Sequence, residues 1–133
     1  MDFYNHTRKL FANGEVTVSN LKVMLVNAYT FSAAQTNLTN VTAAQVSGNG
    51  WPVGGPVVTS AAITVEGAGA KLDGSDISIT ASGGEIGAAT ALVVVDATSS
   101  KPLFHFTFPS SQTAGEGTPF NINWNVAGIA AWS

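Results

Sequence analysis

The sequence predicts one all-β domain, a β-sandwich or jelly-roll-like fold with a short N-terminal helix. Six or seven short runs of β-branched and aromatic residues are separated by Gly, Pro, Asn and Asp turns, the spacing typical of sandwiches. No strand run alternates with a long helical pattern, which disfavours a parallel α/β sheet. The length of 133 residues and the apolar content of 45% suit a single hydrophobic core.

The first 14 residues are predicted to form a helical arm on a domain that covers residues 1–133. Apolar side chains share one face at helical spacing over residues 3–12. Asn13 and Gly14 end the helix, since both tolerate the left-handed backbone found at helix ends. A helix of two or three turns is not stable alone in water, so it must be held by packing.

Strands are expected at residues 21–26, 57–65, 77–81, 91–95, 103–108 and 120–126. Residues 77–81 and 103–108 alternate, which places Phe104, Phe106 and Phe108 on one face. Residues 91–95 are continuously apolar and belong in the middle of a sheet. In the last strand, Trp124 and Val126 are expected to point inward.

The segment between the first two strands is polar and irregular. One or two helical turns are expected at residues 41–46, with Asn40 as the N-cap. Residues 48–56 form a Gly/Pro loop that carries Trp51. A turn follows residues 57–65 at positions 66–69, and a hairpin turn is expected at residues 73–76.

Charge is the unusual feature of the composition. Only 10% of residues are charged, against about 25% in an ordinary soluble domain. Because charged side chains are depleted at the cores of interfaces, we interpret this as a surface partly covered by partners. The alternative is a free domain that is simply neutral.

Several classes of partner are disfavoured. The net charge is −3 with five basic residues, and Arg8 and Lys9 are the one adjacent basic pair, so no nucleic-acid partner is expected. No run approaches the roughly 20 apolar residues of a membrane helix, and the N-terminus lacks the pattern of a secretory signal. Without cysteine, no disulfide can form.

Residue patterns for chemistry are weak, so no enzyme, metal site or cofactor is expected. His105 has no second histidine nearby and is expected to face solvent or a partner. The Asp73–Asp76 segment resembles part of a calcium loop, but a turn explains it more simply. No Gly-x-Ser-x-Gly motif occurs, and the acids Glu85, Asp96 and Glu116 are not paired.

Aromatic residues leave two alternatives open. Trp51, Trp124 and Trp132 could form a platform on which sugar rings stack. We favour the second interpretation, in which Trp124 belongs to the core and the other two fill an interface or a loop.

Four segments resemble a family of small tailed-bacteriophage virion proteins. The first is Phe3-Tyr4-Asn5-His6-Thr7-Arg8-Lys9-Leu10-Phe11-Ala12-Asn13-Gly14. It is followed in order by a Lys-Val-Met-Leu-Val strand at residues 22–26, a Gly-Gly loop after an aromatic at residues 50–55, and a Phe-x-Ile-x-Trp-Asn-x-x-Gly-Ile segment at residues 120–129. The resemblance spans nearly the whole chain.

The resemblance implies a structural protein of the virion, assembled in the cytoplasm of a bacterial host. A capsid decoration (cement) protein that binds the major capsid protein and itself, as a homo-oligomer and by analogy a trimer, is the first expectation. The alternative is a tail, collar or fibre component that binds host surface glycan or connects virion parts. The residues expected at partner contacts are Phe3, Tyr4, Arg8, Phe11, Trp51 and Trp132.

Overall fold

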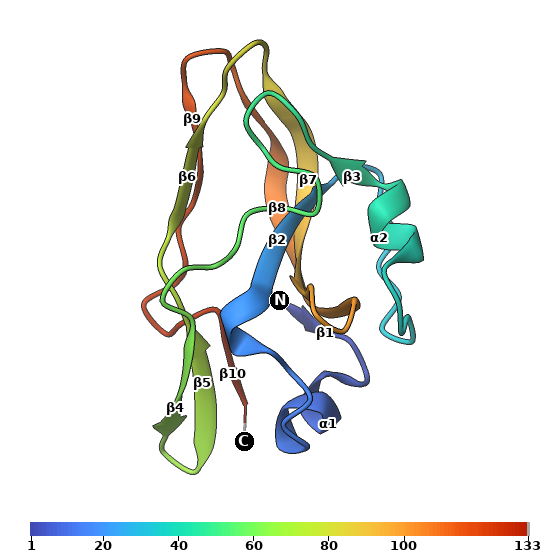
Figure 1. The fold of residues 1–133 in the computed structure, drawn as a ribbon, viewed down its shortest axis with the longest axis vertical. Helices are drawn as coiled ribbons and strands as arrows, with labels where there is room; N and C mark the ends of the chain where they lie inside the picture. Colours follow the sequence, from blue (N-terminus) through green and yellow to red (C-terminus); the bar gives the residue numbers. More distant parts are fainter. Residues whose placement is uncertain (133) are drawn as a thin grey trace.

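The first layer of the fold is an antiparallel sheet. A computed structural model describes residues 1–132 (Figure 1). The sheet contains, in spatial order, β1 (Asp2–Phe3), β8 (Lys101–Ala114), β7 (Ile86–Asp96), β2 (Leu21–Val26) and β3 (Gln45–Val46). The three long strands form its centre, while β1 and β3 pair with only two residues each. Residues 21–26 and 91–95 therefore lie side by side, and residues 91–95 lie in the middle of the sheet as predicted.

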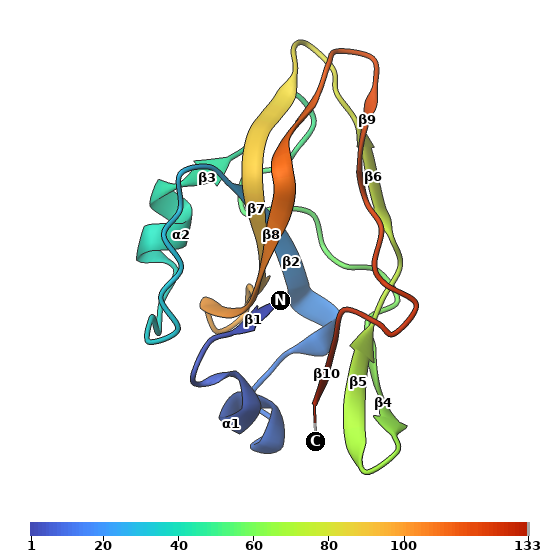
Figure 2. The same ribbon diagram turned by 180° about the vertical axis from the view of Figure 1, so that it is seen from behind.

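The second layer is made of two smaller antiparallel sheets. One has the order β10 (Ala130–Trp132), β5 (Gly69–Asp73) and β4 (Ala62–Glu66), and the other pairs β6 (Ile77–Thr80) with β9 (Pro119–Ile122). Figures 1 and 2 show both sheets on the same side of the β2–β7–β8 sheet. The main core lies between the layers and includes Val23, Leu92 and Phe104 from the first and Leu72 and Phe120 from the second. The all-β class is confirmed, and its two layers form a sandwich.

A second, smaller core covers the opposite face of the first layer. The segment after β2, with the short helix α2 (Thr39–Ala43), lies over that face (Figure 2). Met24, Val26, Val93 and Val95 point into this core, where Val41 is fully buried. Because both faces of β2 and β7 are covered, residues 23–26 of β2 and 91–95 of β7 are continuously apolar instead of alternating.

The N-terminal helix forms, but it is shorter than expected. Helix α1 spans Thr7–Ala12, because Asp2 and Phe3 instead pair with His105 and Phe104 of β8. The Thr7 hydroxyl is buried and donates to the carbonyl of Leu103 at 2.7 Å, which ties the helix to the sheet. A single 3-10 turn, η1 (Val18–Asn20), leads from the arm into β2.

Three predicted boundaries are wrong for local reasons. Helix α2 begins at Thr39 after Leu38, so Asn40 is not its N-cap; instead, the Asn37 side chain accepts the N–H of Thr39 at 3.0 Å. Strand β4 covers only the end of residues 57–65. Strand β9 ends at Ile122, and the side chain of Val126 is 97% exposed, because a turn forms between Asn125 and Gly128.

Strand β5 was missed by the sequence reasoning, and this changes the neighbouring turn. Its five residues, Gly69–Asp73, are mostly small or polar and give no β signal. Because β5 pairs with β4 and β10 while β6 pairs with β9, residues 73–76 connect two sheets and are not a hairpin turn.

Candidate interaction surface

Aromatic side chains from four elements meet at one end of the sandwich. Phe3 of β1, Phe11 of α1 and Trp132 of β10 are half-buried and pack around the buried Phe104 of β8. The ring centroids of Phe11 and Trp132 are 4.8 Å apart, and those of Phe3 and Phe104 are 5.1 Å apart. These spacings fall within the range of favourable aromatic pairs. We call these four residues the aromatic cluster.

Arg8 adds a cation to the aromatic cluster. Its guanidinium carbon lies 4.0 Å from the centroid of the Phe3 ring, and the side chain is otherwise exposed. Such a cation–π contact at an exposed site is worth about 0.5–1 kcal/mol. Four of the six predicted contact residues, Phe3, Arg8, Phe11 and Trp132, are thus brought together at one surface.

The other two predicted contact residues are covered by the domain itself. Tyr4 is 1% exposed and its hydroxyl shares a hydrogen bond with that of Tyr29; burial and this bond raise the pKa of Tyr4 well above its ordinary value. Trp51 is also 1% exposed and packs edge-on against Phe120, with ring centroids 5.4 Å apart. Since both side chains fill the cores, they present no surface to a partner.

The β4–β5 hairpin extends the apolar surface beyond the aromatic cluster. Trp132 pairs with Ala70 of β5, and Ala70 pairs with Val65 of β4, so the three lie in one row across the sheet. Val65 is 85% exposed and Ile63, two residues away on the same face, is 41% exposed. The sequence predicts Ile63 and Val65 only as strand residues. Their exposure could not be predicted, because a strand pattern does not show whether another layer covers it.

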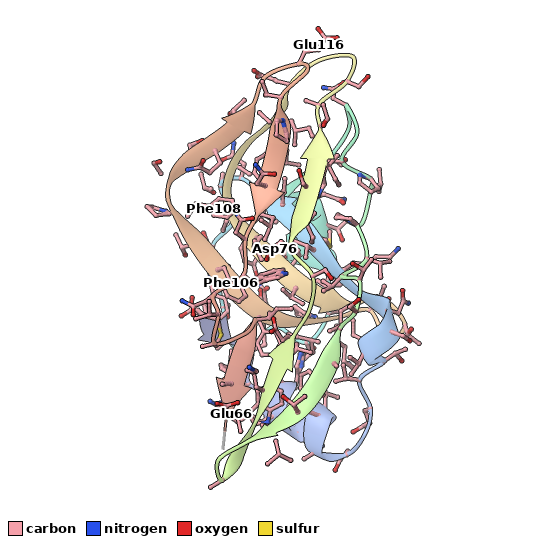
Figure 3. The ribbon with its side chains drawn as sticks, turned by 90° about the vertical axis from the view of Figure 1, so that its left-hand side faces the viewer. Glu66, Asp76, Phe106, Phe108 and Glu116 are labelled. Atoms are coloured by element: carbon pink, nitrogen blue, oxygen red, sulfur yellow. The ribbon has the colours of Figure 1, made fainter. Side chains whose placement is uncertain are left out.

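A neutral groove opens on another side of the sandwich, between β8 and the segment around β9. It has a volume of about 460 Å³, and Phe106 and Phe108, labelled in Figure 3, form one wall. The half-buried Trp124 packs against Phe106, with ring centroids 5.8 Å apart, so the two rings form one aromatic surface of the groove. It is neutral in its side chains, because no Asp, Glu, Lys or Arg is among the described residues that line it, and Asn121 and Asn123 supply exposed amides.

His105 is buried and does not face solvent, contrary to the prediction. Its Nδ1 atom lies 2.9 Å from the Asp2 carboxylate, and its ring stacks on Phe31 at a centroid distance of 4.8 Å. The loop after β2 covers this face of β8. The alternation of residues 103–108 placed His105 on the face opposite the phenylalanines but could not show that this face is also covered. His6 bonds through Nε2 to the carbonyl of Pro102 at 2.6 Å. Both histidines thus join the N-terminal arm to β8.

The carboxylates of Asp73 and Asp76 accept hydrogen bonds from backbone N–H groups. Asp73 accepts the N–H of Gly74 at 2.8 Å, and Asp76 accepts the N–H of Trp124 at 2.8 Å. Within residues 1–132, no group of three or more His, Asp or Glu side chains is placed to hold a metal ion.

Asp96 is a buried carboxylate that organises the turn after β7. It accepts hydrogen bonds from the N–H of Thr17 at 3.2 Å, the N–H of Thr98 at 3.0 Å and the hydroxyl of Ser99 at 2.9 Å. Replacing Asp96 with alanine leaves these donors without their partner in a site that is 0% exposed. We expect the free energy of unfolding to fall by about 2–4 kcal/mol, measured by urea denaturation. Asp76→Ala, which removes a more exposed carboxylate, should cost clearly less.

The fold and these surfaces define an all-β sandwich domain with a partly exposed aromatic cluster at one end. A scan against protein-family models, a search of curated proteins and a search of solved structures each found no match to the chain. In the part of the chain that the structure describes, no helix combines the length and apolar character needed to cross a membrane.

Proposed function

We propose that this chain is a bacteriophage virion structural protein, a capsid decoration protein that binds the major capsid protein and stabilises the head. The observation that carries the proposal is the continuous apolar surface formed by the aromatic cluster and the face of the β4–β5 hairpin that bears Ile63, Val65 and Ala70. It supports a protein partner because Trp132, Ala70 and Val65 form one row that runs from half-buried to exposed.

The composition supports the same proposal. Contiguous apolar surface on a soluble domain marks an interaction site, and the centre of a protein interface is poor in charge and rich in aromatic residues. Arg8 above Phe3 fits this composition, because arginine and aromatic residues are the residues on which binding energy concentrates. The resemblance of the N-terminal segment to virion proteins adds the class of partner.

The mechanism would be mechanical. Many copies would each bridge neighbouring capsid subunits through the aromatic cluster, and weak contacts would add up over the lattice. Association of the protein with itself, as the trimer expected by analogy, would place several aromatic clusters on one shell at once. Loss of such bridges leaves the shell intact but easier to rupture by heat.

The first test is the position of the protein in the particle. Cryo-electron microscopy of virions with and without the protein is expected to show its density spread over the capsid lattice. Density restricted to one vertex, the tail or a fibre would overturn the decoration role. It would favour a connector or adsorption component instead.

The second test is a contact variant. Phe11→Ala should weaken binding to undecorated heads by about 30-fold, the loss typical of an interface hot spot of 2 kcal/mol. Binding is measured by co-sedimentation of the purified protein with heads. Thr107→Ala, a change at an exposed position on β8, is the matched control and should bind like the unchanged protein. Unchanged binding of Phe11→Ala, with a native circular dichroism spectrum, would contradict the proposed surface.

A second function is favoured by the neutral groove. The adjacent rings of Phe106 and Trp124, combined with the amides of Asn121 and Asn123, suit a neutral sugar, which stacks its apolar face on an aromatic surface and hydrogen-bonds through its hydroxyl groups. In this alternative the protein is a tail, collar or fibre component that recognises host surface glycan. The variant that separates the two functions is Trp124→Ala.

A further inference from the structure

The outer edge of β4 lacks most of the features that keep sheet edges apart, although the strand is short and ends in the charged Glu66. All five of its residues are exposed, and the strand contains no proline, lysine or bulge. Natural proteins block free edges with such features, because an unpaired row of N–H and C=O groups pairs with other strands. The hairpin projects past the rest of the domain in Figures 1 and 2, and Figure 3 labels Glu66 in this part of the molecule.

The hairpin geometry shows which backbone groups face outward. Glu66 and Gly69 close a two-residue turn with Gly67 at φ +59°, as a type II′ hairpin requires. From this closing pair, hydrogen-bonded and non-hydrogen-bonded pairs alternate, so Ile63 and Val65 direct their N–H and C=O groups away from β5.

The other edge of the hairpin confirms this alternation. Leu72, the partner of Ile63, accepts the N–H of Ile129 at 2.7 Å on the β10 side, so its carbonyl points away from β4. In the described part of the chain, no other backbone group bonds to Ile63 or Val65.

We propose that β4 pairs antiparallel with β4 of a second copy of this chain, about a two-fold axis at Thr64. In this register Ile63 of one copy faces Val65 of the other as a hydrogen-bonded pair, and this occurs twice. The two Thr64 residues face each other as the closer, non-hydrogen-bonded pair. The strand is therefore complementary to itself in backbone groups and in side chains.

Charge also permits a second copy at this edge. Glu66 is the one charged residue of β4, and its carboxylate lies 3.9 Å from the Lys71 ammonium of the same chain. In the proposed register Glu66 faces Ala62 of the other copy, so no like charges meet across the axis. Contact between Ile63 of one copy and Val65 of the other would also join the exposed apolar faces of the two hairpins into one larger apolar surface.

The contact is expected to be weak in dilute solution. One edge of five residues buries much less than the roughly 1,200–2,000 Å² of a stable interface. On a crowded particle surface the effective concentration of copies is high, and such pairs would form. This inference rests on the proposed function and specifies a two-fold contact between copies, which is separate from the three-fold contact of the trimer expected by analogy.

Cysteine crosslinking of the purified full chain tests the register, since the natural sequence contains no cysteine. In Thr64→Cys, the two sulfurs would lie across a non-hydrogen-bonded pair, where the Cα atoms are close enough for a disulfide. We expect it to form a disulfide dimer about tenfold faster than Ala68→Cys, because pairing raises the local thiol concentration. Ala68 lies at the exposed tip of the same hairpin but would be about 27 Å from its copy.

Adding Val65→Pro to Thr64→Cys should abolish this advantage. The Val65 N–H faces outward, so proline removes an intermolecular donor without removing a bond to β5. Circular dichroism and the melting temperature check that the variant is folded. Equal crosslinking rates for Thr64→Cys and Ala68→Cys would overturn the proposal, as would crosslinking of Thr64→Cys that is as fast with Val65→Pro as without it. Head binding of Phe11→Ala is measured separately, so a protein that decorates heads without pairing would refute this inference alone.

Discussion

Gly55→Ala is expected to destabilise the protein by more than about 4 kcal/mol, among the largest effects of any single substitution. A Cβ atom at position 55 would lie 1.8 Å from the carbonyl oxygen of Val23 and 2.4 Å from its carbonyl carbon. Both are backbone atoms of the central strand β2, which cannot move without disturbing its pairing with β7. The φ angle of +83° adds strain for any residue with a Cβ.

The neighbouring glycine provides a matched control. Gly54 has the same φ of +83°, but a Cβ there would meet nothing within 4 Å. Gly54→Ala should therefore cost only the backbone strain of about 1–2 kcal/mol. The comparison is made by urea unfolding of both variants. Equal losses at the two positions would show that β2 and the Gly-Gly loop are not packed as closely as described.

Trp51→Ala is expected to lower the free energy of unfolding by about 3–5 kcal/mol, because it empties a large site in the core. Trp51 is the largest of the fully buried side chains and packs against Phe120. Its indole Nε1 is buried, with no hydrogen-bond partner in the described residues. Trp51→Phe removes this unpaired donor while keeping an aromatic ring, so its cost should be clearly smaller.

Trp124→Ala is the matched comparison to Trp51→Ala and separates core packing from ligand binding. Trp124 is half-buried in the wall of the neutral groove, and its indole N–H donates to the carbonyl of Ser75 at 3.1 Å. We expect a smaller loss of stability than for Trp51→Ala. If the groove binds sugar, binding to a glycan array is lost in Trp124→Ala and retained in folded Trp51→Phe. An unchanged protein that binds no glycan would count against the adsorption role.

The candidate surface was only partly predictable. Phe3, Arg8, Phe11 and Trp132 were chosen from the sequence, and the fold places them together although Phe11 and Trp132 are 121 positions apart along the chain. Tyr4 and Trp51 were chosen by the same reasoning and are buried, because aromatic residue type alone does not distinguish core from interface. Val65 and the free edge of β4 gave no signal, since exposure depends on which strands pair.

Local interactions along the chain were sufficient to determine much of the fold. Strand β2 was predicted with its observed limits, because its run of β-forming residues has the length of a buried strand. The end of the N-terminal helix at Asn13 and Gly14 and the shared face of Phe104, Phe106 and Phe108 were also predicted correctly. Each depends on backbone preference or on the two-residue period of a strand, which a short stretch of sequence specifies.

The features that decide function required the tertiary structure. The pairing of β5 with β4 and β10, the burial of His105 under a polar loop and the exposure of Val65 all depend on contacts between segments distant in sequence. The sequence by itself determined an all-β domain that is poor in charge. Only the packing of its layers decided which apolar side chains fill the cores and which remain exposed for a partner, because burial is a property of the neighbours that a side chain acquires on folding.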